Sequence, residues 1–127
     1  MHEASTAQAL ADAVLREAGE RKAVRVLRVE LELGELSFLE PDQIGFWLEH
    51  LFRDTPAQGA EVSIATVKPQ VRCEKCGYTG GIETHEDPAY HLMLPRFSCP
   101  RCGAADLMVE RGRECILRRV EMEVREE

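Results

Sequence analysis

The sequence predicts an α+β fold in which two helices pack on a small three-stranded sheet and a cysteine-rich module is inserted before the last strand. Three observations lead to this fold class. Apolar residues recur at helical spacing in two stretches of the first half. They alternate with polar residues in three strand-like stretches, and two Cys-x-x-Cys pairs precede the third of these. Such periodicities are the primary sequence signals of helices and strands.

The first helix is predicted over residues 5–18. Ser5 followed by Gln8 matches a capping box, which would satisfy donors at the start of the helix. The apolar stripe of this helix consists of Ala7, Leu10, Val14, Leu15 and Ala18. The second helix is predicted to begin at Pro41, a residue favoured at the first helical position, and to close at Thr55-Pro56. Its stripe consists of Ile44, Trp47, Leu48, Leu51 and Phe52.

Three strands are predicted from apolar alternation. The first contains Leu27, Val29, Leu31 and Leu33, the second contains Val62, Ile64 and Thr66, and the third contains Ile116, Val120, Met122 and Val124. We expect the C-terminal strand to rejoin the sheet of the N-terminal strands, which makes the cysteine module an insertion. The predicted domains are therefore residues 1–70 plus 112–127 and, as a zinc-binding module, residues 71–111.

Length and charge limit the class of protein. The 127 residues suffice for one domain with a small metal-stapled appendage, and 44% hydrophobic and 31% charged residues are typical of a globular chain. The net charge is −7, and residues 1–67 carry 12 acidic and 6 basic side chains. Since a nucleic-acid-binding face is basic, we expect no nucleic-acid partner. This acidity suits a cation or a basic partner, and equally a solvated surface.

The sequence also predicts a cytoplasmic protein. No stretch approaches the roughly 20 apolar residues of a membrane span, so no membrane association is expected. The opening Met-His-Glu-Ala-Ser has neither the basic nor the apolar segment of a secretory signal. In a reducing compartment cysteines are more often metal ligands or thiols than disulfides, and five cysteines is an odd number.

Four of the five cysteines form two matched knuckles, each followed by glycine and separated by the 22 residues from Gly77 to Ser98. A Cys-x-x-Cys loop directs two sulfurs to one centre, and two such loops complete a tetrahedral four-sulfur site. The predicted ligands are Cys73, Cys76, Cys99 and Cys102. Structural zinc is the favoured metal. The knuckles also resemble those of rubredoxin, an iron protein, and four-sulfur geometry alone does not separate iron from zinc.

Other cysteine and histidine residues are assigned by context. Cys115 lies outside the knuckles, and we expect a buried, inert thiol on the last strand. His50 is predicted to lie on the surface of the second helix. His85 and His91, with Glu86 and Asp87 between them, are interpreted as exposed loop residues because their spacing matches no closed metal site.

His2 adds a second candidate metal site. An α-amine, deprotonated backbone amides and an imidazole together offer nitrogen donors that suit square-planar Ni(II) or Cu(II). Taken alone, a histidine next to an N-terminus is a weak signal, because most chain ends are mobile.

Several motifs together resemble a known family. The chain contains, in order, Met1-His2-Glu3, Gly34-Glu35-Leu36-Ser37, Glu40-Pro41, Gly59-Ala60-Glu61 and the paired knuckles. This combination resembles the HypA/HybF family of hydrogenase maturation nickel chaperones over nearly the whole chain. The resemblance implies an α/β nickel-binding domain with an inserted zinc ribbon. It implies that Met1, His2 and Glu3 hold Ni(II) through the α-amine, the His2 imidazole and the amides of His2 and Glu3, and that the four knuckle cysteines hold structural Zn(II).

The resemblance further implies a metallochaperone that is not an enzyme. Its nickel would pass to the large subunit of a [NiFe]-hydrogenase in cooperation with the maturation GTPase HypB, and in some relatives also to urease. The chain has no phosphate-binding Gly-Lys-Ser loop, so nucleotide hydrolysis would belong to a partner. The sequence leaves a homodimer open. An electron carrier and a zinc-ribbon interaction module are the alternatives, and each explains only the knuckles.

Overall fold

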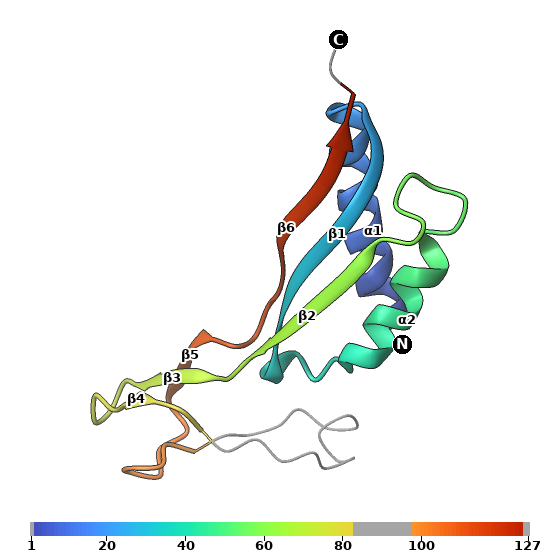
Figure 1. Cartoon of the computed structure of the whole chain (residues 1–127). Helices are drawn as coiled ribbons and strands as arrows, with labels where there is room; N and C mark the ends of the chain where they lie inside the picture. The colour runs from blue at the N-terminus through green and yellow to red at the C-terminus, as the bar shows by residue number, and fades with distance from the viewer. Residues whose placement is uncertain (1, 83–97, 126–127) are drawn as a thin grey trace. The chain divides into compact units, whose positions relative to one another are not determined.

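The computed structural model describes residues 2–82 and 98–125, and the chain divides into two compact units. The first unit comprises residues 1–32, 39–65 and 116–127, and the second comprises residues 33–38 and 66–115. Figure 1 traces the chain through both units. In the described part of the chain, no helix is long and apolar enough to cross a membrane.

The first unit begins with helix α1, His2–Glu20. Its buried side chains are Ala7, Leu10, Ala11, Val14 and Ala18, which confirms the predicted stripe except that Leu15 is half-buried. The predicted capping box is wrong, because the helix already begins at His2 and Ser5 lies inside it. Gln8 instead donates to Asp12 Oδ1, one turn later. Lys22, at φ 52°, reverses the chain into the first strand.

Strand β1, Ala23–Gly34, is the centre of the first sheet. It lies between β2, Glu61–Val67, and β6, Cys115–Val124. The prediction that the C-terminal strand rejoins the N-terminal sheet is therefore confirmed. Along β1 the predicted inward residues Val29, Leu31 and Leu33 are buried. Leu27 is not: its side chain is 43% exposed while Val26 is buried, because the alternation shifts phase before Val29.

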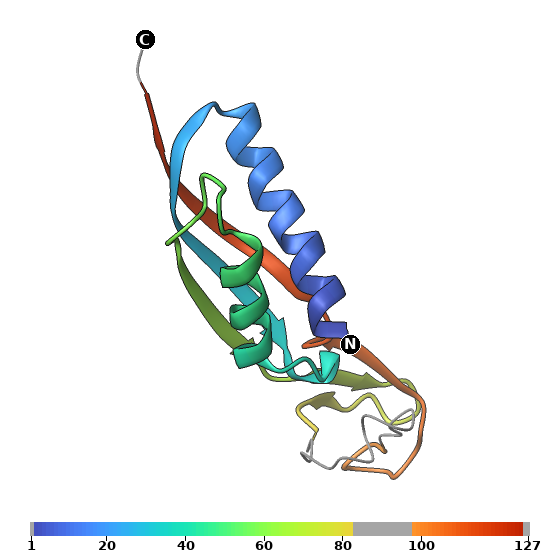
Figure 2. The same cartoon turned by 90° about the vertical axis from the view of Figure 1, so that its right-hand side faces the viewer.

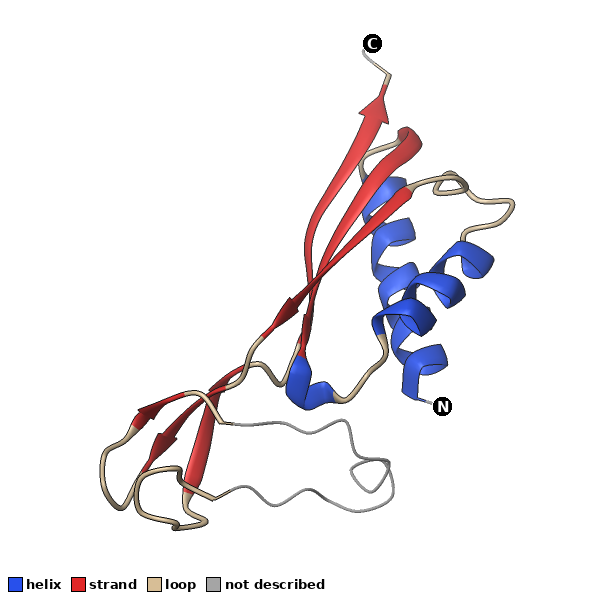
Figure 3. Cartoon of the chain, turned by 60° about the horizontal axis from the view of Figure 1, so that its bottom comes forward, coloured by secondary structure: helices blue, strands red, loops and turns tan. Residues whose placement is uncertain are grey.

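Helix α2, Pro41–Leu51, begins where the sequence predicts but ends at Leu51, before the expected stop at Thr55-Pro56. Ile44, Leu48 and the following Phe52 are buried. Helices α1 and α2 pack against one another and lie on the same side of the β2-β1-β6 sheet (Figures 2 and 3). The first unit is thus a two-layer α/β sandwich with a single apolar core, as expected for elements that each bury one face.

The opposite face of β1 is charged. Glu30 and Glu32 alternate with the buried residues, so their side chains project away from the helices. Arg28 pairs with Glu30 at 3.1 Å and with Glu61 of β2 at 3.5 Å, and Arg118 of β6 pairs with Glu32 at 3.6 Å. The first of these pairs lies within β1, and the other two join neighbouring strands, as opposite charges on one face of a sheet do.

The second unit contains a sheet that the periodicity of the sequence does not reveal. Its strands are β3, Gln70–Cys73, β4, Thr79–Gly80, and β5, Leu107–Arg111, in the antiparallel order β4-β3-β5. Val71 is the buried apolar residue of β3. Strands this short bury little apolar surface, so the unit needs another source of stability.

Residues 33–38, the end of β1 and the residues that follow it, belong to this second unit. They contain the short 3-10 helix η1, Glu35–Ser37. The N–H groups of Gly34 and Leu36 donate to the carbonyls of Glu114 and Gly112, at 3.0 and 2.8 Å. The sequence places the Gly-Glu-Leu-Ser motif here, and these bonds tie it to the segment between β5 and β6.

Candidate metal centres

The four knuckle cysteines form one compact cluster in the second unit. Their Sγ atoms all lie within 4.8 Å of one another. Cys73 Sγ is 3.6 Å from Cys102 Sγ, and Cys76 Sγ is 3.6 Å from Cys99 Sγ, so each close pair joins the two knuckles. Cys73 and Cys99 are buried, Cys76 is half-buried and Cys102 is exposed. The predicted four-thiol set is therefore brought together.

The two knuckles have the same backbone geometry. In the first, Gly77 N–H donates to Cys73 O at 3.0 Å, and Cys73 N–H donates to Tyr78 O at 2.7 Å. The second knuckle repeats this pattern: Gly103 N–H donates to Cys99 O at 2.9 Å, and Cys99 N–H donates to Ala104 O at 2.8 Å. The two glycines have φ 79° and 77°, a left-handed conformation that favours glycine. The glycine after each Cys-x-x-Cys pair thus closes the turn that aims both sulfurs inward.

Backbone N–H groups favour the thiolate form of one of these sulfurs, Cys99 Sγ. The N–H groups of Arg101 and Cys102 point at Cys99 Sγ, at 3.4 and 3.5 Å. Desolvation raises the pKa of the Cys99 thiol, but these two N–H groups and the neighbouring thiols of Cys76 and Cys102 outweigh it and lower the pKa to about 6. The thiolate is the form that binds metals, so the knuckle itself favours the ligating state.

The crowding of the sulfurs has the opposite effect on Cys102. The Ala104 N–H lowers the pKa of this thiol, but desolvation and hydrogen bonds with the other three cysteines raise it to about 11. Four thiolates in one cluster repel each other unless a cation lies between them. A bound cation would resolve this conflict, because a coordinated thiol is fully deprotonated.

The sulfur spacing fits a tetrahedral metal ion. Zn–S bonds of about 2.3 Å place tetrahedral sulfurs about 3.8 Å apart, close to the 3.6 Å that separates Cys73 Sγ from Cys102 Sγ and Cys76 Sγ from Cys99 Sγ. All four positions of such an ion would be filled by protein sulfur. A closed site of this kind holds a fold together and leaves no position for a substrate.

The fifth cysteine takes no part in this cluster. Cys115 begins strand β6 and is half-buried, which confirms its predicted place outside the knuckles and on the last strand. Burial raises the pKa of its thiol, so Cys115 is protonated at neutral pH and a weak nucleophile.

At the second candidate centre, the structure describes Glu3 and the backbone of His2, whereas Met1 lies outside the described residues. Glu3 is in the first turn of α1, and its Oε2 accepts a hydrogen bond from the backbone N–H of Glu40 at 3.1 Å. Partial burial raises the pKa of the Glu3 carboxyl, but this bond, one from its own N–H and the positively charged N-terminal amine together lower the pKa from its ordinary value.

Of the other histidines the structure describes His50, which is not a member of the cysteine cluster. His50 is exposed on α2, as predicted, with its ring 6.2 Å from that of Trp47 in an edge-on arrangement. The loop residues His85 and His91 lie outside the described residues.

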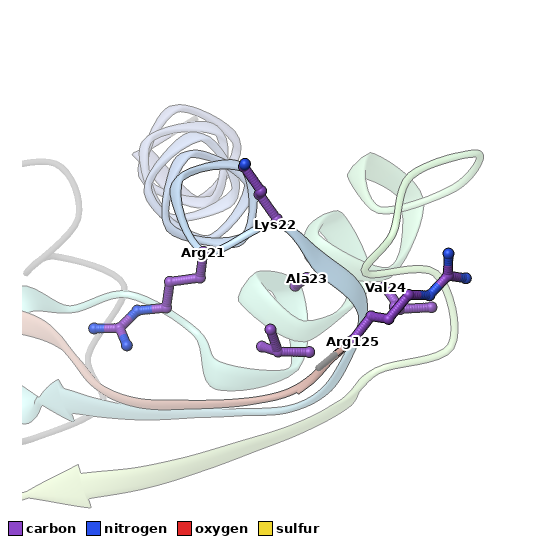
Figure 4. A pocket seen from close by; sticks show the side chains of 6 residues that line it. Arg21, Lys22, Ala23, Val24 and Arg125 are labelled. Atoms are coloured by element: carbon purple, nitrogen blue, oxygen red, sulfur yellow. The ribbon is translucent and has the colours of Figure 1, made fainter. Parts of the chain in front are cut away.

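A hollow at the other end of α1 offers no metal ligands. It is lined by Arg21, Lys22, Ala23, Val24, Val124 and Arg125. Figure 4 shows that its three basic side chains point in different directions rather than toward one centre. Arg21 is also paired with Glu17. The hollow is therefore no candidate for binding a cation.

Sequence reasoning missed two contributors to these centres. Tyr78 accepts the Cys73 N–H through its carbonyl, and its hydroxyl donates to Gly81 O at 2.8 Å, which braces the first knuckle. Glu40 belongs to the Glu40-Pro41 motif of the sequence, but that motif does not predict that its N–H donates to Glu3. Neither contact leaves a periodic pattern or spacing that a sequence shows.

A family model and the individual relatives named below all carry the same family name, and the matches span nearly the whole length of this chain. Residues 1–122 match the sequence model of the family described as "Hydrogenase/urease nickel incorporation, metallochaperone, hypA". A hydrogenase maturation factor HypA from Methanothermobacter thermautotrophicus is 37% identical over 123 residues, which cover 97% of this chain and 98% of that protein. Another from Methanopyrus kandleri is 35% identical over 134 residues, which cover 98% and 94%.

Solved structures resemble the fold. The solution structure of the Ni metallochaperone HypA from Helicobacter pylori superposes with a TM-score of 0.66 at 19% identity, covering 97% of this chain and 98% of that one. A second solution structure of a HypA protein has a TM-score of 0.68 at 21% identity and covers 98% of both chains. At this level of identity the likeness concerns the fold, and it confirms the predicted fold class.

Proposed function

Because the chain belongs to the HypA family of hydrogenase and urease nickel-incorporation metallochaperones, we propose that it binds Ni(II) at its first three residues and delivers the ion for maturation of a [NiFe]-hydrogenase. The observation that carries this proposal is the match of residues 1–122 to the family, which includes Met1-His2-Glu3. Urease is a second client that the family description supports.

The proposed nickel donors are the Met1 α-amine, the His2 imidazole and the backbone amides of His2 and Glu3. Four nitrogens suit Ni(II), which readily adopts square-planar coordination. Helix α1 begins at His2, and amides in the first turn of a helix are not engaged by its i−4 hydrogen bonds. The backbone nitrogens that the chelate needs therefore lie outside the hydrogen-bond ladder of α1.

The same placement accounts for release of the cargo. A site at the end of a helix can exchange its ligands one by one with those of an acceptor. The amine, imidazole and amides must lose protons to coordinate, so affinity should fall with acid. The excess of acidic side chains in residues 1–67 favours a divalent cation over an anionic ligand.

We propose that Cys73, Cys76, Cys99 and Cys102 hold Zn(II) as a structural ion. Zn(II), when bound, supplies four bonds that join the two knuckles of a unit with a small core. The cluster geometry and the thiolate-favouring donors at Cys99 support a metal. Membership in a nickel-delivery family favours the structural ion over the iron of an electron carrier, since electron transfer has no part in that role.

We further propose that delivery takes place with two partners, the maturation GTPase HypB and the large subunit of the hydrogenase. The chain contains no Gly-Lys-Ser loop of its own. Any nucleotide hydrolysis that drives the transfer would therefore be supplied by the GTPase.

Native mass spectrometry of the untagged protein tests the proposal. We expect one retained zinc and, after addition of one equivalent of Ni(II), one nickel. His2→Ala should lose the nickel and keep the zinc, whereas the control His50→Ala, which removes an exposed histidine of α2, should keep both. One bound iron with visible absorption and no His2-dependent nickel would instead establish an electron carrier.

A further inference from the structure

We propose that the Glu3 carboxylate is a positioning group, which fastens the first turn of α1 to the start of α2 and thereby orients the nickel-binding backbone, rather than a nickel ligand. This inference rests on the proposed nickel site. It assigns a distinct task to the third residue of Met1-His2-Glu3: its amide belongs to the chelate, and its side chain holds that amide in place.

The contact joins two residues that are far apart in sequence. Glu3 Oε2 accepts the Glu40 N–H at 3.1 Å across a separation of 37 residues. Glu40 is the residue that precedes α2, with extended backbone at φ −89° and ψ 117°. Its carbonyl accepts the first bond of α2, from Ile44 N–H at 3.1 Å, while its N–H is directed away from that helix. Figure 2 shows the N-terminal end of α1 beside the start of α2.

The packing of α1 against α2 fixes the position of the Glu40 N–H relative to Glu3. Helices α1 and α2 contact one another directly, and Ala7 of α1 and Ile44 of α2 are both fully buried. The Glu40 N–H therefore belongs to the start of a helix, α2, that is held in place by the core. The carboxylate also sits in the first turn of α1, where a negative charge is stabilised by the helix dipole.

The hydrogen bond between Glu3 and Glu40 reduces the conformational entropy that the N-terminal residues lose when they bind nickel. Chain ends fray unless a contact holds them, and binding to a frayed end must immobilise every residue that supplies a ligand. A hydrogen bond at Glu3 holds the third residue before nickel arrives. Nickel binding then needs to order only the residues ahead of it.

Titration of Ni(II) alone into the full-length protein tests this role, with calorimetry for affinity and the visible d–d absorption band for the ligand set. Glu3→Ala should bind nickel about five- to ten-fold more weakly, the loss expected for one solvent-exposed hydrogen bond. The band should keep its position, because the donor atoms are unchanged. Glu3→Gln keeps an acceptor oxygen and should restore most of the affinity.

The donor side supplies an independent test. Glu40→Pro removes the N–H and keeps an extended backbone, while Glu40→Ala keeps the N–H. We expect Glu40→Pro to bind nickel about five- to ten-fold more weakly than Glu40→Ala. Combining Glu40→Pro with Glu3→Ala should add little further loss, since both remove the same bond. Asp42→Asn, which removes a nearby exposed carboxylate, serves as the control and should bind nickel like wild type.

Three results would overturn the inference. If Glu3→Gln binds as weakly as Glu3→Ala and the absorption band shifts, the carboxylate is a ligand. If Glu3→Ala binds like wild type while His2→Ala still loses nickel, the hydrogen bond has no role, and the proposed function stands without it. If His2→Ala itself binds nickel like wild type, the proposed nickel site is wrong and this inference falls with it.

Discussion

Gly34 and Gly112 lie in direct backbone contact, so that a Cβ atom on Gly34 would overlap the carbonyl group of Gly112. The hydrogen bond from Leu36 N–H to Gly112 O, at 2.8 Å, holds the two segments at this separation. Gly112 itself has φ 96°, and a Cβ there would lie 2.7 Å from Pro69 Cα. Three backbone segments thus meet where only hydrogen atoms fit between them.

Gly34→Ala should therefore destabilise the protein strongly. The overlap is with backbone, which cannot rotate aside as a side chain does, so we expect a loss of about 3 kcal/mol or more in the free energy of unfolding, measured with urea. The matched control is Gly45→Ala in α2, where nothing lies within 4 Å of the added Cβ. That change should stabilise by about 0.5–1 kcal/mol, the usual gain of alanine over glycine in a helix. Equal stability of the two variants would contradict this account.

Removal of the proposed zinc ion should unfold the second unit selectively. Its described buried hydrophobic residues are few, namely Leu33, Val71, Cys73 and Cys99, and the two cysteines are proposed ligands. After treatment with a strong chelator, hydrogen exchange should show loss of protection in β3 and β5, while α1 and α2 keep theirs. Cys99→Ser should reproduce this loss, whereas Cys115→Ser should retain the metal. Full protection of β3 without metal would show that the ion is dispensable.

The two phenylalanines of the α2 region should differ sharply in their effect on stability. Phe52 is 2% exposed and Phe46 is 60% exposed. Phe52→Ala leaves a cavity in the core of the first unit and should cost about 3–5 kcal/mol in urea unfolding. Phe46→Ala should change stability by less than about 1 kcal/mol, since little of its surface leaves water on folding. A large loss for Phe46→Ala would mean that another part of the protein covers it.

The Cys115 thiol should make stability depend on pH on the alkaline side. Burial raises its pKa above the ordinary 9.0, so the unfolded chain loses this proton at a lower pH than the folded protein. Its contribution is fully present below the pKa of the unfolded thiol and is lost as pH rises through the folded pKa. Urea midpoints at pH 8 and pH 10 should therefore fall less in Cys115→Ala than in wild type. Equal falls in the two proteins would contradict a buried thiol.

Local patterns predicted the elements of the first unit because each pattern lies within a single segment. Helix α2 begins at Pro41 as expected, since proline suits the first helical position and the apolar stripe follows at once. The sequence did not predict the first turn of α1, because Ser5 and Gln8 match a capping box while the helix in fact begins at His2. The strands β3 and β5 were missed for a different reason: strands this short carry too few alternations to stand out.

The candidate thiol site was predicted almost completely. The spacing within each knuckle and the glycine after it specify a turn that directs two sulfurs inward, and the structure shows that turn at Gly77 and Gly103. The choice of which sulfurs become close neighbours, Cys73 with Cys102 and Cys76 with Cys99, depends on how the knuckles face each other. No spacing along the chain encodes that.

The sequence by itself determined the two helices, the strands of the first sheet, the members of the four-thiol cluster and the family. Periodicity, knuckle spacing and motifs can each be read along the chain. Only the tertiary structure decided the sheet order β2-β1-β6, the glycine contact at Gly34 and Gly112, and the bond from Glu40 to Glu3. Each of these joins residues that are distant along the chain. Such contacts form through the packing of whole elements, and packing depends on shape and backbone direction rather than on any local pattern.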